Sequence, residues 1–105
     1  MSTGGARPGL FIVHRTRPGR REDVRRVWET HMLPAIADNP GHVCYVYTFD
    51  AVEPDVIRVF QEYASSESSA AFLAGPAYAA YLVAVEPLLV DEPELHPVDV
   101  QWRKA

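Results

Sequence analysis

The chain has 105 residues, of which 48% are hydrophobic and 23% are charged, and its formal net charge is −4. This length corresponds to one domain, and the composition is that of an ordinary globular protein. The negative net charge argues against binding to nucleic acid or to an anionic membrane surface, because both require a positive field.

The N-terminal residues 1–8 are rich in Gly, Ser and Pro. We expect them to be a poorly ordered tail ahead of a single domain over residues 9–105. The tail lacks the apolar stretch of a secretory signal, and no window approaches the roughly 18 apolar residues of a membrane span. The single cysteine, Cys44, cannot form an internal disulfide, which is compatible with a reducing compartment. We therefore expect a cytoplasmic protein.

The first strand is predicted over residues 10–16, where an apolar run is ended by Arg17-Pro18-Gly19. A helix should then run from about Arg20 to Ala37, because its apolar residues recur at the spacing of one helical face. Pro34 should kink this helix or end its regular part early. The predicted buried face consists of Val24, Val27, Trp28, His31, Met32 and Ala35.

Two apolar runs, residues 42–49 and 56–63, are joined by a turn-forming segment and predict an antiparallel hairpin. Alternation along the first run places Val43, Tyr45, Tyr47 and Phe49 on one face and Cys44 and Val46 on the other. Both faces of this strand are therefore apolar. Helices in so short a chain can cover only one face of a sheet, so we expect a second copy of the protein to cover the other.

The remaining elements are two short helices and a strand. Ser65 is a suitable N-cap for a helix that reaches Ala74, Gly75-Pro76 separates it from a helix over about residues 77–86, and a last strand covers residues 95–102. Pro97 suggests that this strand lies at a sheet edge. The order β-α-β-β-α-β is typical of the ferredoxin-like α+β fold, a four-stranded antiparallel sheet with helices on one face.

Several segments in this order carry a family resemblance, and they span roughly residues 10 to 90. They are Arg17-Pro18-Gly19, the run from Asn39-Pro40-Gly41 into Tyr45, the turn Glu53-Pro54-Asp55, the run Gln61 to Ser65, and the run Phe72 to Tyr78. With these segments the chain resembles the antibiotic biosynthesis monooxygenase family of the dimeric α/β-barrel superfamily. The resemblance implies a homodimer that oxidises a quinol-like or polycyclic aromatic molecule with O₂ and without a cofactor.

Two positions depart from that family's pattern. The chain has Gln61-Glu62-Tyr63 where many members have Glu-x-Trp, and Phe72 where the haem-degrading branch has a histidine. Phe72 cannot bind iron, and the four histidines show no metal-ligand spacing. We therefore expect no metal, haem or other cofactor.

No local catalytic motif is present, so any active site must combine separate elements. We predict His31 as the base, since histidine is the side chain best suited to proton transfer near neutral pH, and Tyr63 as a second catalytic group. Trp28, Tyr45, Tyr47, Phe72 and Tyr78 are predicted to line the substrate site. The alternatives are that His31 lies at the edge of the core and that the tyrosines form an ordinary aromatic core. The protein would then be a non-catalytic dimeric module that binds a small molecule.

Overall fold

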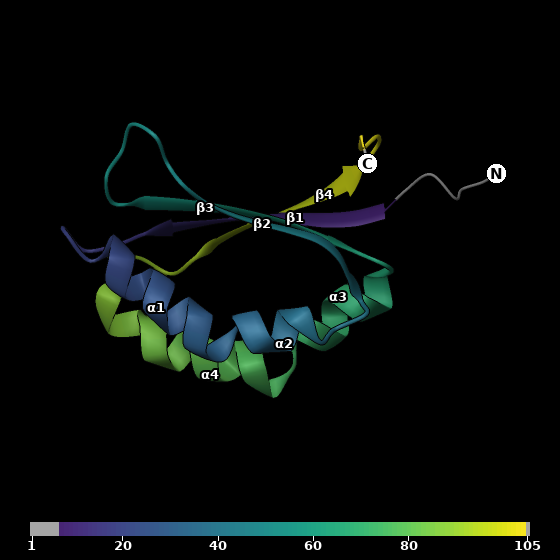
Figure 1. The fold of residues 1–105 in the computed structure, drawn as a ribbon, viewed down its shortest axis with the longest axis horizontal. Helices are drawn as coiled ribbons and strands as arrows, with labels where there is room; N and C mark the ends of the chain where they lie inside the picture. The colour runs from purple at the N-terminus through teal and green to yellow at the C-terminus, as the bar shows by residue number, and fades with distance from the viewer. Residues whose placement is uncertain (1–6, 105) are drawn as a thin grey trace.

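The computed structural model describes residues 7–104, which form one sheet and a layer of helices (Figure 1). The strands are β1 (Arg7–Arg15), β2 (His42–Phe49), β3 (Val56–Tyr63) and β4 (Glu94–Val100). The helices are α1 (Arg21–His31), α2 (Leu33–Ala37), α3 (Ser66–Leu73) and α4 (Pro76–Val85), and α4 continues into a 3₁₀ turn, Glu86–Leu88.

The sheet is antiparallel throughout, with the strand order β2-β3-β1-β4. Figure 1 shows all four helices on one side of the sheet. This arrangement confirms the predicted ferredoxin-like α+β fold. It also confirms that the strand containing Pro97 lies at an edge, where a missing backbone N–H is tolerated.

The N-terminal boundary of the domain differs from the expectation. Strand β1 begins at Arg7 and not after residue 8, because Arg7 and Pro8 continue the pairing of β1 with Val100 and Asp99 of β4. The rest of the expected tail, residues 1–6, lies outside the described residues.

Pro34 divides the first helical segment in two, as the sequence predicted. Its ring nitrogen has no hydrogen to donate to the carbonyl of residue 30, and the ring crowds that carbonyl. Helix α1 therefore ends at His31, with the N–H of Met32 still bonded to the Trp28 carbonyl at 2.8 Å, and α2 begins at Leu33 with Pro34 in its first turn.

A β-bulge at the start of β2 changes which side chains face the helices. His42 pairs with Tyr63 and Cys44 pairs with Glu62, so Val43 is an extra residue with no partner in the ladder. The prediction that Val43 shares the face of Tyr45 is therefore wrong, and Val43 is exposed. His42, in contrast, is turned to the helix side, where its ring contacts that of Tyr63.

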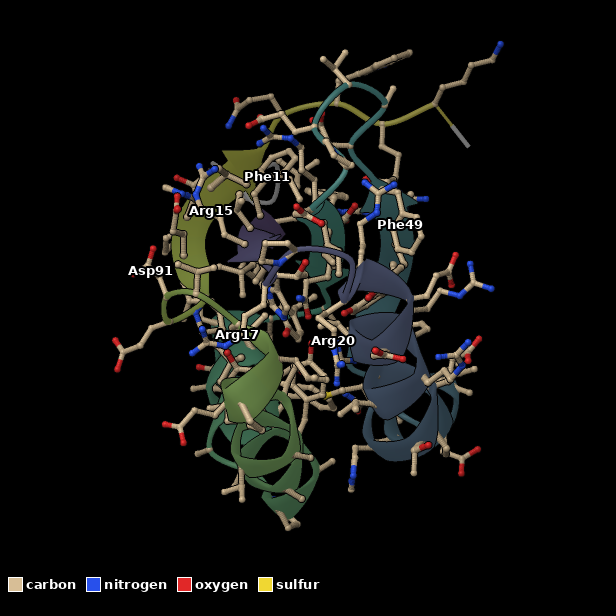
Figure 2. The ribbon with its side chains drawn as sticks, turned by 90° about the vertical axis from the view of Figure 1, so that its left-hand side faces the viewer. Phe11, Arg15, Arg17, Arg20, Phe49 and Asp91 are labelled. Atoms are coloured by element: carbon tan, nitrogen blue, oxygen red, sulfur yellow. The ribbon has the colours of Figure 1, made fainter. Side chains whose placement is uncertain are left out.

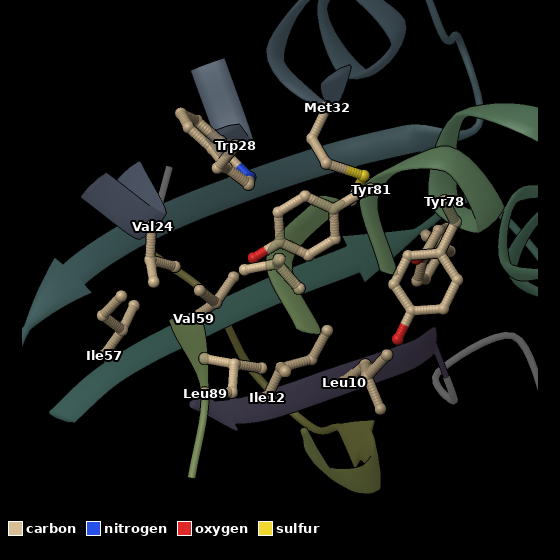
Figure 3. Close-up of a cluster of buried hydrophobic side chains, with 12 residues drawn as sticks. Leu10, Ile12, Val24, Trp28, Met32, Ile57, Val59, Tyr78, Tyr81 and Leu89 are labelled. Carbon is tan, nitrogen blue, oxygen red and sulfur yellow. The ribbon is translucent and has the colours of Figure 1, made fainter. Parts of the chain in front are cut away.

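The core lies between the sheet and the helices (Figure 3). Val24, Trp28 and Met32 of the first helical segment and Tyr78 and Tyr81 of α4 pack against the inner faces of β1 and β3. Leu89, just after the 3₁₀ turn, closes one end of this core. The buried residues of α1 recur every four positions, which is the period of a helix with one apolar face.

We call the opposite side of the sheet the open face. Phe11 and Val46 are 46% and 45% exposed there, and the Phe11 ring lies 4.9 Å from that of Phe60. Figure 2 shows Phe11 and Arg15 on the side of the sheet away from the helices. Near the end of this face, the buried carboxylate of Glu62 lies 3.0 Å from both Arg7 and Arg103.

Within residues 7–104, no single helix has the length and apolar composition needed to cross a membrane; only the pair Ser66–Leu73 and Pro76–Leu88, bent by 49°, passes that test together.

Candidate functional site

All five tyrosines of the chain lie between the sheet and the helices, and we call them the tyrosine cluster. They are Tyr45 and Tyr47 from β2, Tyr63 from β3, and Tyr78 and Tyr81 from α4. Burial raises the pKa of every one of these phenols. They are therefore uncharged at neutral pH, and each hydroxyl can donate a hydrogen bond.

Trp28 connects α1 to the β2 side of the cluster. Its indole Nε1 donates to the Tyr45 hydroxyl at 3.1 Å, and its ring centroid lies 4.3 Å from that of Tyr47. The Tyr47 hydroxyl is buried and has no hydrogen-bond partner among the described residues. This part of the interior therefore holds a free donor beside a flat aromatic wall.

His14 of β1 is paired with Tyr81 of α4 inside the core. The imidazole Nε2 lies 2.6 Å from the Tyr81 hydroxyl, and both side chains are buried. Burial lowers the pKa of His14 from 6.5 to about 4, so the imidazole is neutral at pH 7. A neutral imidazole bound to a neutral phenol is a proton acceptor held in a defined position.

His42 lies at the other end of the interior, where it contacts three elements. Its ring is 4.6 Å from Phe72 of α3 and 4.6 Å from Tyr63 of β3. Its Nδ1 lies 2.8 Å from the Asn39 amide nitrogen, and its Nε2 lies 3.1 Å from Oε1 of Gln61. Both ring nitrogens therefore have partners, which suits a positioning role better than proton transfer.

A groove of about 570 Å³ lies between α4 and the chain that leads into β4, and we call it the α4–β4 groove. Its volume is in the usual range for a small-molecule site. Figure 2 labels Arg17 and Asp91, two residues that line this groove. Its wall carries the charged residues Arg17, Glu86, Asp91 and Glu92. The apolar lining is Tyr78, Leu82, Val85, Leu89, Val90, Pro93 and Leu95.

Tyr78 belongs to both the α4–β4 groove and the tyrosine cluster, so it connects the two. Figure 3 shows its hydroxyl directed toward Leu10 on the inner face of the sheet. Phe72 lines a second groove of about 560 Å³, formed by small residues of α3 and the turn before β2. The interior is thus bordered by two grooves, each with one aromatic ring in its wall.

The structure brings together most of the predicted site residues. Trp28 contacts both Tyr45 and Tyr47, and His42 lies between Tyr63 and Phe72. His31 is placed differently: it is half-buried at the C-terminal end of α1 and is not one of the residues that form the core. Its catalytic role stays a prediction.

Sequence reasoning gave too little weight to His14, His42 and Gln61. His42 is turned inward by the bulge at Val43, which simple alternation along the strand does not predict. For His14 the available signal was its position two residues after Ile12 on one strand, which places both on the same face. Among residues 7–104, no group of three or more His, Cys, Asp or Glu side chains is arranged to hold a metal ion.

Comparison with solved structures agrees with this architecture. A "putative antibiotic biosynthesis monooxygenase" from Caulobacter crescentus superposes with a TM-score of 0.83 at 20% identity, over 91% of both chains. One with the same description from Chloroflexus aurantiacus gives 0.78 at 24% identity, over 94% of this chain and 97% of that one. The chain has the antibiotic biosynthesis monooxygenase fold.

A third structure with this fold, a protein of unknown function from Nitrosomonas europaea, matches with a TM-score of 0.81 at 22% identity, over 96% of this chain and 95% of that one. No family model matches the sequence, and no curated protein matches it significantly. These structural similarities show the fold of the chain.

Proposed function

We propose that this protein is a cofactor-independent monooxygenase that oxidises a quinol-like or polycyclic aromatic small molecule with O₂. The observation that carries the proposal is the buried His14–Tyr81 pair, one helical turn along α4 from Tyr78, which lines the α4–β4 groove. The groove offers an apolar surface for aromatic rings, and the pair offers a neutral proton acceptor next to Tyr78, whose ring centroid lies 6.4 Å from that of Tyr81.

Such a reaction needs only a base and hydrogen-bond donors, because the substrate supplies the electrons. Removal of a hydroxyl proton gives an aromatic anion that reacts with O₂; one oxygen atom enters the product and the other leaves as water. A neutral imidazole can accept the proton, and the phenols of the tyrosine cluster can stabilise the negative oxygen.

For the base we propose His14 in place of His31. The Tyr81 hydroxyl can receive a proton from the substrate while it passes its own proton to Nε2 of His14, 2.6 Å away. Tyr63, predicted as a second catalytic group, donates its hydroxyl proton to Oε1 of Gln61 and so helps to fix that amide. Tyr78 lines the α4–β4 groove, and we propose that a substrate passing it would contact the other predicted site residues, Trp28, Tyr45, Tyr47 and Phe72.

We also propose that the protein acts as a homodimer joined through the open face. Phe11 and Val46 together leave apolar surface on that face, and no helix covers it in Figure 1. An apolar sheet face in water is costly, and a second copy would remove it from water.

The direct test is O₂ uptake by the purified protein on a panel of hydroquinones and anthrones, without flavin and with a metal chelator present. We expect consumption of one O₂ per substrate molecule, above the uncatalysed rate measured with heat-denatured protein. His14→Gln should lose the activity, and Val83→Ala, on the exposed side of α4, should keep it. Uptake at the uncatalysed rate across the panel would contradict the proposal.

One observation favours a second candidate, a non-catalytic module that binds a small molecule. The described wall of the α4–β4 groove carries carboxylates and Arg17, and neither His14 nor Tyr81, both buried, is part of it. An aromatic ligand could occupy this groove without meeting a base. Saturable binding of the same panel with no O₂ uptake would identify this function.

A further inference from the structure

A chain of hydrogen bonds runs from the turn before β2 into the interior, and we call it the amide relay. Its members are the backbone N–H of Gly41, the amide of Asn39, the imidazole of His42 and the amide of Gln61. The three links measure 3.1 Å from Gly41 N to Asn39 Oδ1, 2.8 Å from Asn39 Nδ2 to His42 Nδ1, and 3.1 Å from His42 Nε2 to Gln61 Oε1.

The first link fixes the direction of every other link. A backbone N–H can only donate, so the atom of Asn39 that faces Gly41 must be its oxygen. The Asn39 NH₂ group then faces His42, and Nδ1 must accept from it. A neutral imidazole whose Nδ1 accepts carries its proton on Nε2, and this N–H donates to Gln61, whose facing atom must be oxygen. Burial lowers the pKa of His42, which favours this neutral form.

Gln61 is thereby held with its amide nitrogen free. Its oxygen accepts from His42 and from the Tyr63 hydroxyl, while its Nε2 has no partner among the described residues. The residue is 1% exposed, so water outside the fold does not reach this group. A buried NH₂ with unused hydrogens is costly unless an acceptor reaches it, and the relay prevents the amide from turning round.

We propose that the Gln61 amide is the binding group for an acceptor oxygen of the ligand, a ketone or phenolate oxygen on an aromatic ring. This deepens the proposed function and rests on it for the class of ligand. Gln61 is paired across the sheet with Leu10, and the Tyr78 hydroxyl is directed toward Leu10 in Figure 3. A ligand that enters from the α4–β4 groove and passes Tyr78 would therefore approach this amide.

The ligand chemistry follows from the relay. An NH₂ donor recognises a carbonyl or phenolate oxygen, and it cannot accept from an O–H group. Tyr47, on the inner face of the neighbouring strand β2, is a second buried donor without a partner among the described residues. His14 Nδ1, on the inner face of β1, is a third buried atom without a partner within residues 7–104, and it carries the proton when Nε2 accepts from Tyr81. Several unpaired donors on this described face favour a ligand with more than one acceptor oxygen, as in a quinone or a deprotonated quinol.

The test uses two bicyclic probes that differ in one oxygen: 1-tetralone, an aromatic ketone that is not a substrate for oxygenation, and tetralin, its hydrocarbon parent. The chain has only two glutamines, Gln61 and Gln101, and one asparagine, Asn39. The side-chain amide region of a ¹⁵N–¹H spectrum therefore contains three NH₂ pairs. We expect saturable tetralone binding to shift the Gln61 pair and to leave that of the exposed Gln101 in place.

A matched pair of variants measures the contribution of the amide. Gln61→Met keeps the length of the side chain and removes the donor, whereas Gln101→Met makes the same change outside the site. We expect Gln61→Met to weaken tetralone binding by about twofold to tenfold, the range for one hydrogen bond, and to leave tetralin binding unchanged. Gln101→Met should change neither affinity.

The outcomes separate this inference from the oxygenase proposal. If tetralone leaves the Gln61 NH₂ pair unshifted, or if tetralin shifts it equally, the amide does not bind ligand oxygen and the inference is wrong. This result is obtained on the wild-type protein, so it does not depend on whether the variants fold. If tetralone behaves as expected but no quinol is oxidised, the amide site stands and the oxygenase proposal fails. If quinols are oxidised while the NH₂ signals of Gln61 never shift, the oxygenase proposal stands and the amide inference fails.

Discussion

The Nε2 atom of His14 and the hydroxyl oxygen of Tyr81 lie 2.6 Å apart and join β1 to α4 inside the core. Neither side chain has appreciable access to solvent, so this hydrogen bond takes the place of one that each group would make to water in the unfolded chain. The pair is therefore important for stability as well as for the proposed chemistry, and the two roles can be measured separately.

Tyr81→Phe should destabilise the protein by about 1–3 kcal/mol, because it leaves His14 Nε2 buried without a partner. Tyr47→Phe is the matched control: it removes a buried hydroxyl that has no partner among the described residues, so stability should change little or rise slightly. Urea unfolding of both variants beside the wild type measures the difference. Equal losses would show that the His14–Tyr81 hydrogen bond contributes nothing specific.

Stability should fall on acidification because of His14. Its pKa is about 4 in the folded protein and near 6.5 when exposed, so below pH 6.5 the unfolded state binds a proton that the folded state does not. The stabilisation is complete above pH 6.5 and decreases toward pH 4, by about 3 kcal/mol in total. The carboxyl of Glu94 has a pKa lowered by a hydrogen bond from Arg15, so the stabilisation that it provides is lost only as the pH falls below about 4.5.

The measurement is the free energy of unfolding at several pH values between 4.5 and 7 for the wild type and His14→Gln. The variant should have a clearly flatter profile in this range, even if it is less stable at pH 7. Parallel profiles would show that His14 does not account for the acid sensitivity.

The identity of the base can be decided with two substitutions, once a substrate is found. If His14 accepts the proton, His14→Gln should slow turnover by about 10²–10⁴-fold, the usual contribution of general acid–base catalysis. If His31 is the base, His31→Gln should do so while the melting temperature changes little. For either variant, raising the pH should restore part of the rate, because the substrate then ionises without help.

The homodimer is tested by charge substitution on the open face. We expect the wild type to have about twice its 11.7 kDa monomer mass by light scattering at micromolar concentration. Val46→Glu should give monomers, since an unpaired charge buried at an interface costs several kcal/mol. Val83→Glu, on the exposed side of α4, is the control and should leave the mass unchanged. A wild-type mass near 12 kDa would contradict the dimer.

The fold could be predicted because local patterns decide most of it. The hairpin strands 42–49 and 56–63 were predicted with their observed bounds, since β-branched and aromatic runs beside a turn leave few alternatives. The position of Trp28 in the core followed from helical periodicity. Ser65 caps α3 as expected, its hydroxyl accepting from the N–H of Ser68 at 3.0 Å.

The site was less predictable because it depends on contacts between distant residues. No local signal shows that a bulge at Val43 turns His42 inward, or that Tyr81 of α4 reaches His14 of β1. Arg21 is a similar case: its Nη1 lies 3.1 Å from the backbone carbonyls of Asp50 and Glu53 in the β2–β3 connection and of Val56 at the start of β3.

The gathering of all five tyrosines in one interior also gives the protein an intrinsic optical reporter of its own unfolding. Burial raises the pKa of each phenol above 10, so tyrosinate forms readily only after the chain opens. In an alkaline titration the ultraviolet absorbance of tyrosinate should rise as one cooperative step and not as five independent ionisations. The rate of that step after a rapid pH jump is the rate at which the core opens, measured without any added dye or label.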